Sequence, residues 1–253
     1  MAEPRRPLKS KSALPIERMP TNMTVALIMH ELRAGVYNIK QSASMLSRLL
    51  TLPAPPIEKL RECARDINVS ASLAVDFLED VRTLRIRGQD PQPRTSISST
   101  EVNAYIQALI AELRPRLGRS IEVRTRYGAK ADCSVHARAR LLTQALRILI
   151  DWAFLWAIKS VEINTTQVHL RQKPSALVVA VSFEMPPVSD VGWQQEISGR
   201  WSPRHKRLGI AVLKKLAREN QWKVTFRRGL ARGTAHEVVE ARLELPMEKA
   251  HAG

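Results

Sequence analysis

Two long segments in the first third of the chain carry apolar residues at helical spacing. In the first, between about residues 22 and 51, an apolar side chain recurs every three or four positions: Ile28, Leu32, Val36, Ile39, Ala43, Leu46 and Leu50. The second, between about residues 57 and 87, repeats this spacing, and the prolines of TLPAPP between them prevent one continuous helix. The pattern predicts a long antiparallel helical hairpin. Because a lone hairpin leaves its apolar stripes half exposed, two hairpins are expected to pair as a dimeric four-helix bundle.

Beyond residue 91 the pattern changes to a mixture of helices and strands. Helical spacing predicts helices at about residues 101–115, 137–159 and 208–220. Alternating or continuous apolar runs predict five strands: IEVRTRY, VHLRQ, ALVVAVSFE, KVTFRR and HEVVEARLELP. The predicted fold class is therefore α+β, with an α/β sandwich (one sheet covered by helices) following the hairpin. The predicted domains are a flexible basic N-terminus (1–20), the hairpin (21–90) and the sandwich (91–248).

The chain is strongly basic, with 40 Lys and Arg against 24 Asp and Glu and a net charge of +16. Such a charge favours anionic partners. Its densest part, residues 200–232, makes nucleic-acid binding a minor alternative, with Trp193, Trp201 and Trp222 as candidate stacking residues.

The cysteines and the hydropathy pattern indicate the cellular location of the protein and whether it binds a metal or a membrane. Cys63 and Cys133 are far apart and suggest neither a disulfide framework nor a metal site, so we expect no metal and a cytoplasmic, reducing location. No apolar stretch reaches the roughly 18 residues of a membrane span, so no membrane association is expected.

His30 lies in the first predicted helix, within the segment MHELRAGV. It falls off the apolar stripe, so its ring is expected to face outward from the bundle. The adjacent Glu31 can polarise the imidazole and make one of its nitrogens a better nucleophile. An HExxH zinc motif is excluded, because Ala34 occupies the position of the second histidine. An ordinary surface histidine is the alternative interpretation.

The segment MHELRAGV resembles the H-box of two-component histidine kinases, in which His-Glu-Leu-Arg is followed by Thr-Pro-Leu. The match is full over residues 30–33, but Ala34 stands where Thr or Asn is usual and Gly35 where Pro is usual. The resemblance implies that His30 is a phosphoacceptor assisted by Glu31. The residues that it implies in partner binding are Arg33, Ala34 and Tyr37.

Four later segments resemble the ATP-binding domain of the same kinases in their order and spacing. They are RLLTQALRILIDWAF (140–154), VAVSFEMPPV (179–188), RLGIAVLKKLARENQW (207–222) and RGTAHEVVEARLELP (232–246). With the hairpin, the resemblance covers about residues 22 to 246. It implies a dimerisation and phosphoacceptor hairpin followed by an ATPase-type domain.

The departures from the family pattern fall on the residues that handle the nucleotide. Asp151 is taken to replace the Asn that helps to hold magnesium, and Phe183 stands where an Asp reads the adenine. Glycines are replaced by Met185, Pro187, His205 and Arg207, and only Gly209 remains. Because Phe183 cannot accept a hydrogen bond and side chains block close approach to phosphates, binding of ATP-Mg is expected to be lost and no cofactor is expected.

The resemblance leaves several functions open. The first is histidine phosphotransfer through His30, to or from the aspartate of a response-regulator receiver domain, by a homodimer that an upstream kinase could also contact. The second is a non-catalytic pseudokinase scaffold or inhibitor that binds a regulator or a kinase. An active ATP-dependent kinase is third, and would need Asp151 and Glu184 to replace the missing polar groups.

Overall fold

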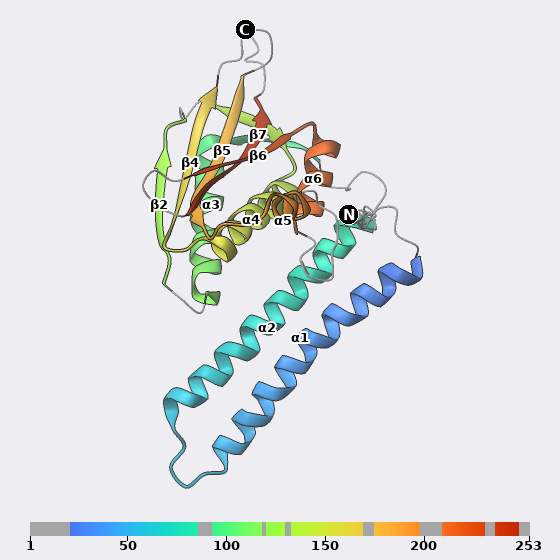
Figure 1. Ribbon diagram of the computed structural model, residues 1–253, viewed down its shortest axis with the longest axis vertical. Coiled ribbons are helices and arrows are strands. Elements are labelled where there is room, and N and C mark those ends of the chain that lie inside the picture. The colour runs from blue at the N-terminus through green and yellow to red at the C-terminus, as the bar shows by residue number, and fades with distance from the viewer. Residues whose placement is uncertain are drawn as a thin grey trace, which may run out of the picture.

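The computed structural model (Figure 1) describes residues 21–85, 93–117, 120–129, 133–168, 175–197, 209–230 and 236–247. The basic N-terminus predicted to be flexible, residues 1–20, lies outside the described residues. So do Trp201, His205 and Arg207.

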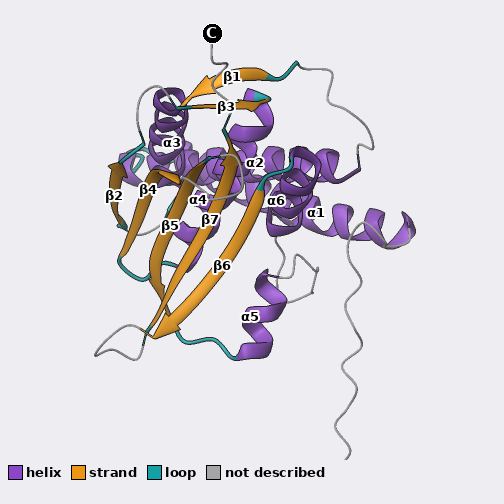
Figure 2. Ribbon diagram, turned by 90° about the horizontal axis from the view of Figure 1, so that it is seen from above, coloured by secondary structure: helices purple, strands orange, loops and turns teal. Residues whose placement is uncertain are grey.

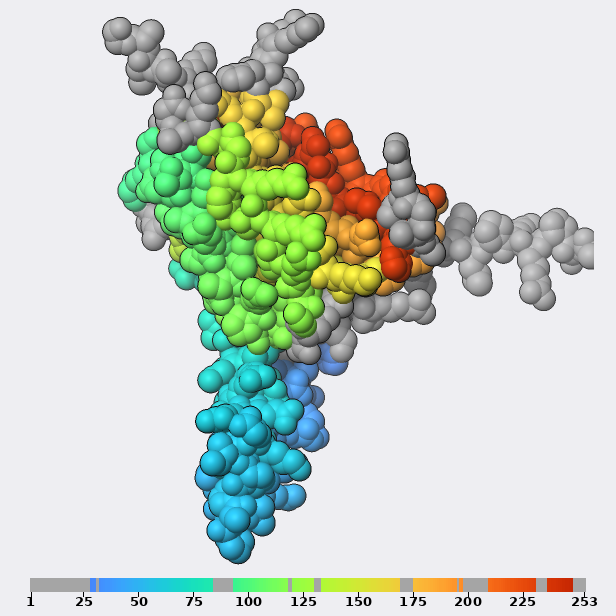
Figure 3. Space-filling view, turned by 90° about the vertical axis from the view of Figure 1, so that its left-hand side faces the viewer, coloured from blue at the N-terminus to red at the C-terminus, as the bar shows by residue number. Residues whose placement is uncertain are grey.

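Two long antiparallel helices form the predicted hairpin. α1 spans Thr21–Leu50 and α2 spans Ile57–Arg85. Figure 3 shows the far part of the hairpin as a narrow stalk that projects from the rest of the molecule. Gly35 lies where the helices approach closely, since a Cβ there would come within 3.5 Å of the Ala74 Cβ. Val36 and Leu50, predicted on the same stripe as Ile28, are exposed, whereas Ile28 is half-buried.

A five-stranded sheet forms the centre of the second part of the chain. Its strands are β2 (Glu122–Tyr127), β4 (Ser160–Val168), β5 (Ala176–Met185), β6 (Lys223–Leu230) and β7 (Glu237–Pro246). Their order is β2-β4-β5-β7-β6; β2 and β4 are parallel and the other neighbours are antiparallel. Two short strands, β1 (Thr95–Ser98) and β3 (Ser134–Ala137), pair separately.

Helices cover one face of the five-stranded sheet (Figure 2). They are α3 (Ser99–Leu113), α4 (Ala139–Trp156) and α6 (Gly209–Asn220), and the short 3₁₀ turn η2 (Arg114–Arg116) follows α3. Ser98 caps α3, accepting from the backbone N–H of Glu101 while the Glu101 carboxylate accepts from the backbone N–H of Ser98. The buried core lies between sheet and helices, so the α/β sandwich and the α+β fold class are confirmed.

The structure differs from the sequence prediction in its short elements. The strand predicted at VHLRQ, residues 168–172, shares only Val168 with β4, which begins at Ser160; residues 169–172 lie outside the described residues. The inward positions of β4 are Val161, Ile163 and Thr165. Thr165 is buried, and its hydroxyl donates a hydrogen bond to Asn103 Oδ1 at 2.9 Å. Because the hydroxyl has this partner, a polar residue is tolerated at an inward position. The eight-residue helix α5 (Asp190–Ile197) was not predicted.

Candidate functional site

His30 lies on α1 with its side chain exposed to solvent. Arg33, Ala34 and Tyr37 follow at spacings of three, four and seven residues, so they share its helical face, and all three are exposed. Gln41 extends this face, since its side-chain amide donates to the Tyr37 hydroxyl at 2.7 Å. The structure therefore brings the predicted phosphoacceptor and partner-binding residues onto one accessible surface, and Glu31 is the neighbour of His30 in the same helix.

The predicted nucleotide-site residues come from three elements of the sandwich, and two of these, α4 and β5, meet at one edge. Phe183 and Met185 end β5, Asp151 belongs to α4, and Gly209 begins α6. The Ile158 backbone N–H donates to the Glu184 carbonyl at 2.9 Å, which fixes the end of α4 against the end of β5. Pro187 is exposed just beyond β5.

Aromatic side chains fill the space between α4 and the end of β5. The Trp152 ring meets both Phe183 and Phe226 edge-on, with ring centroids 5.3 Å apart in each pair. Trp193 of α5 packs on the same indole at 6.3 Å. Trp152, Phe183 and Trp193 are each buried. We call these four residues the aromatic cluster; such edge-to-face arrangements are favourable beyond the burial of area alone.

Polar contacts hold α5 over the aromatic cluster. Glu196 accepts hydrogen bonds from the indole N–H groups of Trp152 at 2.9 Å and Trp156 at 3.1 Å. Arg228 of β6 donates to the Val188 carbonyl at 2.9 Å, pairs with Asp190, and lies 5.5 Å above the Trp193 ring. These contacts close α5 onto the sandwich.

Gly209 and Asp151, both predicted at the nucleotide site, lie close to other parts of the protein instead. A Cβ on Gly209 would come within 3.1 Å of the Ile148 side chain, so this glycine allows α6 to pack closely on α4. Asp151 lies near enough to Asp80 of α2 for its charge to help raise the pKa of the Asp80 carboxyl. It is Trp152, one residue further along α4, that points to Phe183.

The candidate nucleic-acid surface loses two of its stacking residues. Trp193 and Trp222 are buried, and Trp201 lies outside the described residues. Base stacking requires an accessible ring face, so neither buried indole can supply it.

The described residues include neither a metal-ligand cluster nor a membrane-spanning helix. No cluster of His, Cys, Asp and Glu there could hold a metal ion. Within the same residues, no helix has both the length and the apolar character needed to cross a bilayer.

Sequence reasoning missed most of this edge of the sandwich. Trp152 comes from α4, Trp193 and Glu196 from α5, and Phe226 and Arg228 from β6, and no spacing in the sequence relates these three elements. The available signal was the run Asp-Trp-Ala-Phe at the end of a buried helix, in which a bulky aromatic residue follows Asp151.

Solved structures of histidine kinases share this fold. The Acinetobacter baumannii histidine kinase AdeS matches 87% of this chain and 98% of its own, with 14% identity and a TM-score of 0.53. Full-length ShkA in complex with AMPPNP matches 92% of this chain and 47% of its own, with 14% identity and a TM-score of 0.55. No family model and no curated protein sequence matches the chain. The chain thus has the fold of a histidine kinase core, consisting of a helical hairpin and an α/β domain of the ATPase type.

Proposed function

We propose that this protein is a two-component phosphorelay protein that exchanges a phosphoryl group with the aspartate of a receiver domain through His30, and that it no longer uses ATP. The observation that carries the proposal is the combination of an exposed histidine on an open helical face with a nucleotide-site edge that is filled by protein side chains. The two cysteines are free, which fits the reducing, cytoplasmic location that we propose.

The chemistry needs an accessible, neutral imidazole. A lone pair of one ring nitrogen attacks the phosphorus of the receiver's aspartyl phosphate, the P–N bond forms, and the P–O bond to the aspartate breaks to release its carboxylate. We assign Glu31 to polarise the ring by accepting a hydrogen bond from its other N–H. Arg33 and Lys40 are exposed on α1 and favour the approach of an acidic receiver site carrying a phosphoryl group.

The aromatic cluster supports the proposed loss of ATP binding. Recognition of adenine would need a hydrogen-bond acceptor for its amino group and open space for its ring. Phe183 has no side-chain acceptor, and its ring packs against that of Trp152 with the centroids 5.3 Å apart. α5 closes the same edge through Glu196 and Arg228. Binding a nucleotide would therefore require breaking both sets of contacts, which leaves the polar groups of α5 without partners.

Homodimerisation is the third part of the proposal. Large apolar side chains recur on the outer faces of both hairpin helices and stay exposed in a single chain: Met29, Val36 and Leu50 on α1, and Ile57, Val75 and Leu78 on α2. Positions 29, 36 and 50, and positions 57 and 78, are separated by multiples of seven residues, the spacing of a helical-bundle seam. A second copy of the hairpin would bury these positions.

A non-catalytic scaffold is the second candidate, because the filled nucleotide edge would suit it equally well. A labelling experiment with two arms separates transfer, ATP-dependent kinase activity and scaffolding. Radiolabelled ATP-Mg should leave the protein unlabelled. Receiver domains that carry a labelled phosphoryl group should instead give acid-labile phosphate on the parent protein. Label from ATP would establish the kinase, and no label from either donor, with receivers still bound, would favour the scaffold.

A further inference from the structure

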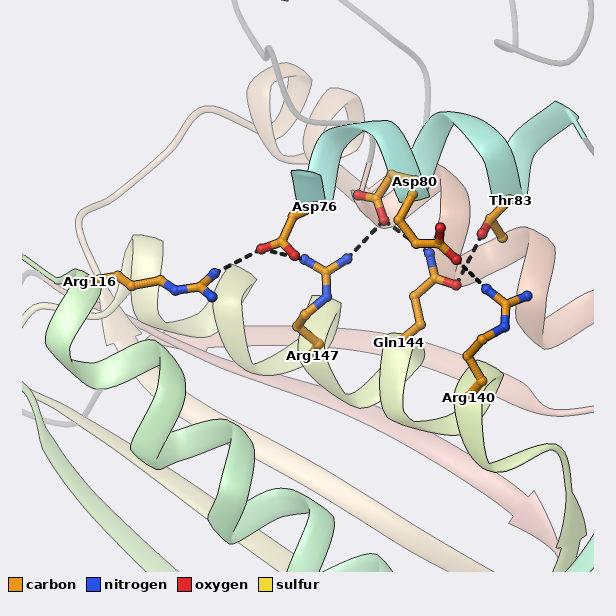
Figure 4. A network of polar contacts seen from close by, with 8 residues as sticks. Asp76, Asp80, Thr83, Arg116, Arg140, Gln144 and Arg147 are labelled. Carbon is orange, nitrogen blue, oxygen red and sulfur yellow. Dashed lines mark hydrogen bonds and ion pairs between the residues drawn. The ribbon is translucent and has the colours of Figure 1, made fainter. Parts of the chain in front are cut away.

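The last turns of α2 carry polar side chains on one face, where they meet the sandwich. Asp76, Glu79, Asp80 and Thr83 are spaced three, four and seven residues apart, so they line one side of the helix. Figure 4 shows Asp76, Asp80 and Thr83 facing Arg116 of η2 and the residues Arg140, Gln144 and Arg147 of α4. Glu79 pairs with Arg140 of α4. We call these eight residues, together with Lys215 of α6, the clasp.

Arg147 is the centre of the clasp. Its guanidinium pairs with Asp76 Oδ2 at 3.0 Å and with Asp80 Oδ1 at 3.1 Å, and Arg116 reaches the same Asp76 oxygen at 2.8 Å. A planar guanidinium that bridges two carboxylates one helical turn apart fixes the rotation of α2 as well as its distance from α4.

Uncharged and backbone groups extend the clasp towards the end of α2. Gln144 donates to Asp80 Oδ1 at 3.1 Å and accepts from the Thr83 hydroxyl at 3.1 Å. Lys215 donates to the Thr83 carbonyl at 2.7 Å, so α6 satisfies a backbone acceptor near the end of α2. At the rim, Glu79 pairs with Arg140.

Burial separates the clasp from ordinary surface ion pairs. The side chains of Asp80, Arg147 and Lys215 are only 12%, 14% and 6% exposed. The Arg124–Glu122 pair on the sheet edge, by contrast, is 61% and 59% exposed. A surface pair opens at little cost, but opening a buried pair leaves charges without partners, so the buried contacts hold one geometry. Phe77 and Val81, between the polar residues, pack against the sandwich core.

We propose that the clasp fixes the sandwich on the hairpin, so that the two parts move as one body and the sandwich keeps a constant position relative to α1. The contacts run over residues 76–83, about 10 Å of helix at 1.5 Å per residue, and involve three separate elements of the sandwich. One rotation axis cannot preserve contacts spread in this way. A domain that swings along the hairpin is therefore excluded while the clasp is closed. This inference does not depend on the proposed phosphotransfer.

Distance measurements by electron paramagnetic resonance test the clasp. Spin labels on Glu58→Cys, near the far end of the hairpin and outside the proposed dimer seam, and on Leu230→Cys, at the end of β6, report the position of the sandwich; both sites are exposed. Cys63 and Cys133 are replaced by alanine, and labelled chains are mixed with excess unlabelled chains so that a dimer carries one label pair. The parent should give one narrow distance distribution.

Three clasp variants and one control decide the outcome. Arg147→Ala and Glu79→Arg should each broaden the distribution, and adding Arg140→Glu to Glu79→Arg should restore the narrow peak. Arg124→Ala, which removes an exposed arginine from the sheet edge, should match the parent. Circular dichroism checks that each variant is folded. If Arg147→Ala unfolds, the test rests on Glu79→Arg and on the double variant that adds Arg140→Glu. A broad distribution in the parent, or a narrow one in folded Glu79→Arg, would overturn the proposal.

Discussion

Asp80 shows how a single carboxyl responds to the packing of α2 on the sandwich. Burial raises its pKa from the ordinary 3.8 to about 6, although the Arg147 guanidinium and the Gln144 amide both act to lower it. The nearby charges of Asp76 and Asp151 add to the rise. The folded state therefore favours the protonated form of Asp80 more than the unfolded chain does.

This pKa shift predicts a pH dependence of stability with a definite sign. The stabilisation from protonated Asp80 is complete below about pH 4 and is lost as the pH rises through about 6; the shift corresponds to about 3 kcal/mol. Urea unfolding between these limits should show the parent losing stability relative to Asp80→Asn, which cannot ionise. Above about pH 7 the difference between the two proteins should become constant. Parallel stability curves across the whole range would refute the assignment.

At the scale of single elements, the sequence predicted helices and strands correctly where an apolar pattern extended over many residues. The two hairpin helices, α4, α6 and β5 were predicted because their apolar residues recur over many positions. β3 and α5 are too short to show a period, and contacts such as Glu196 with Trp152 hold α5 in place. The clasp was invisible for a related reason, since Asp76 and Asp80 have the pattern of a solvated helix face.

Gly35 gives a prediction for α1. Its Cβ position is 3.5 Å from the Ala74 Cβ, an ordinary van der Waals distance, so alanine fits without displacing α2. Gly35→Ala should raise the free energy of unfolding by about 0.5–1 kcal/mol, because glycine is a poor residue for a helix interior. Gly35→Leu, which overfills the same contact, is the comparison and should destabilise the protein. Urea unfolding that showed Gly35→Ala to be the less stable protein would contradict this packing.

For the whole molecule, the exposed seam on the hairpin predicts a homodimer in solution. Leu78→Lys places a charge on this seam and should convert the dimer to monomer at micromolar concentration, as measured by light scattering. Val191→Lys makes the same change at an exposed apolar residue of α5, outside the hairpin, and should leave the dimer intact. A parent protein that is monomeric at this concentration would count decisively against the four-helix bundle.

The most direct test of the central claim is the transfer of labelled phosphate from phosphorylated receiver domains to this protein, measured with receiver affinity in parallel. The parent should gain acid-labile phosphate. His30→Ala should gain none while it binds the receiver as the parent does, because His30 is exposed and its truncation leaves no cavity. Glu31→Gln should transfer more slowly, by up to roughly 10²–10⁴-fold, if the carboxylate assists the ring. Equal labelling of the parent and His30→Ala, or no labelling of a parent that binds phosphorylated receivers, would contradict phosphotransfer through His30.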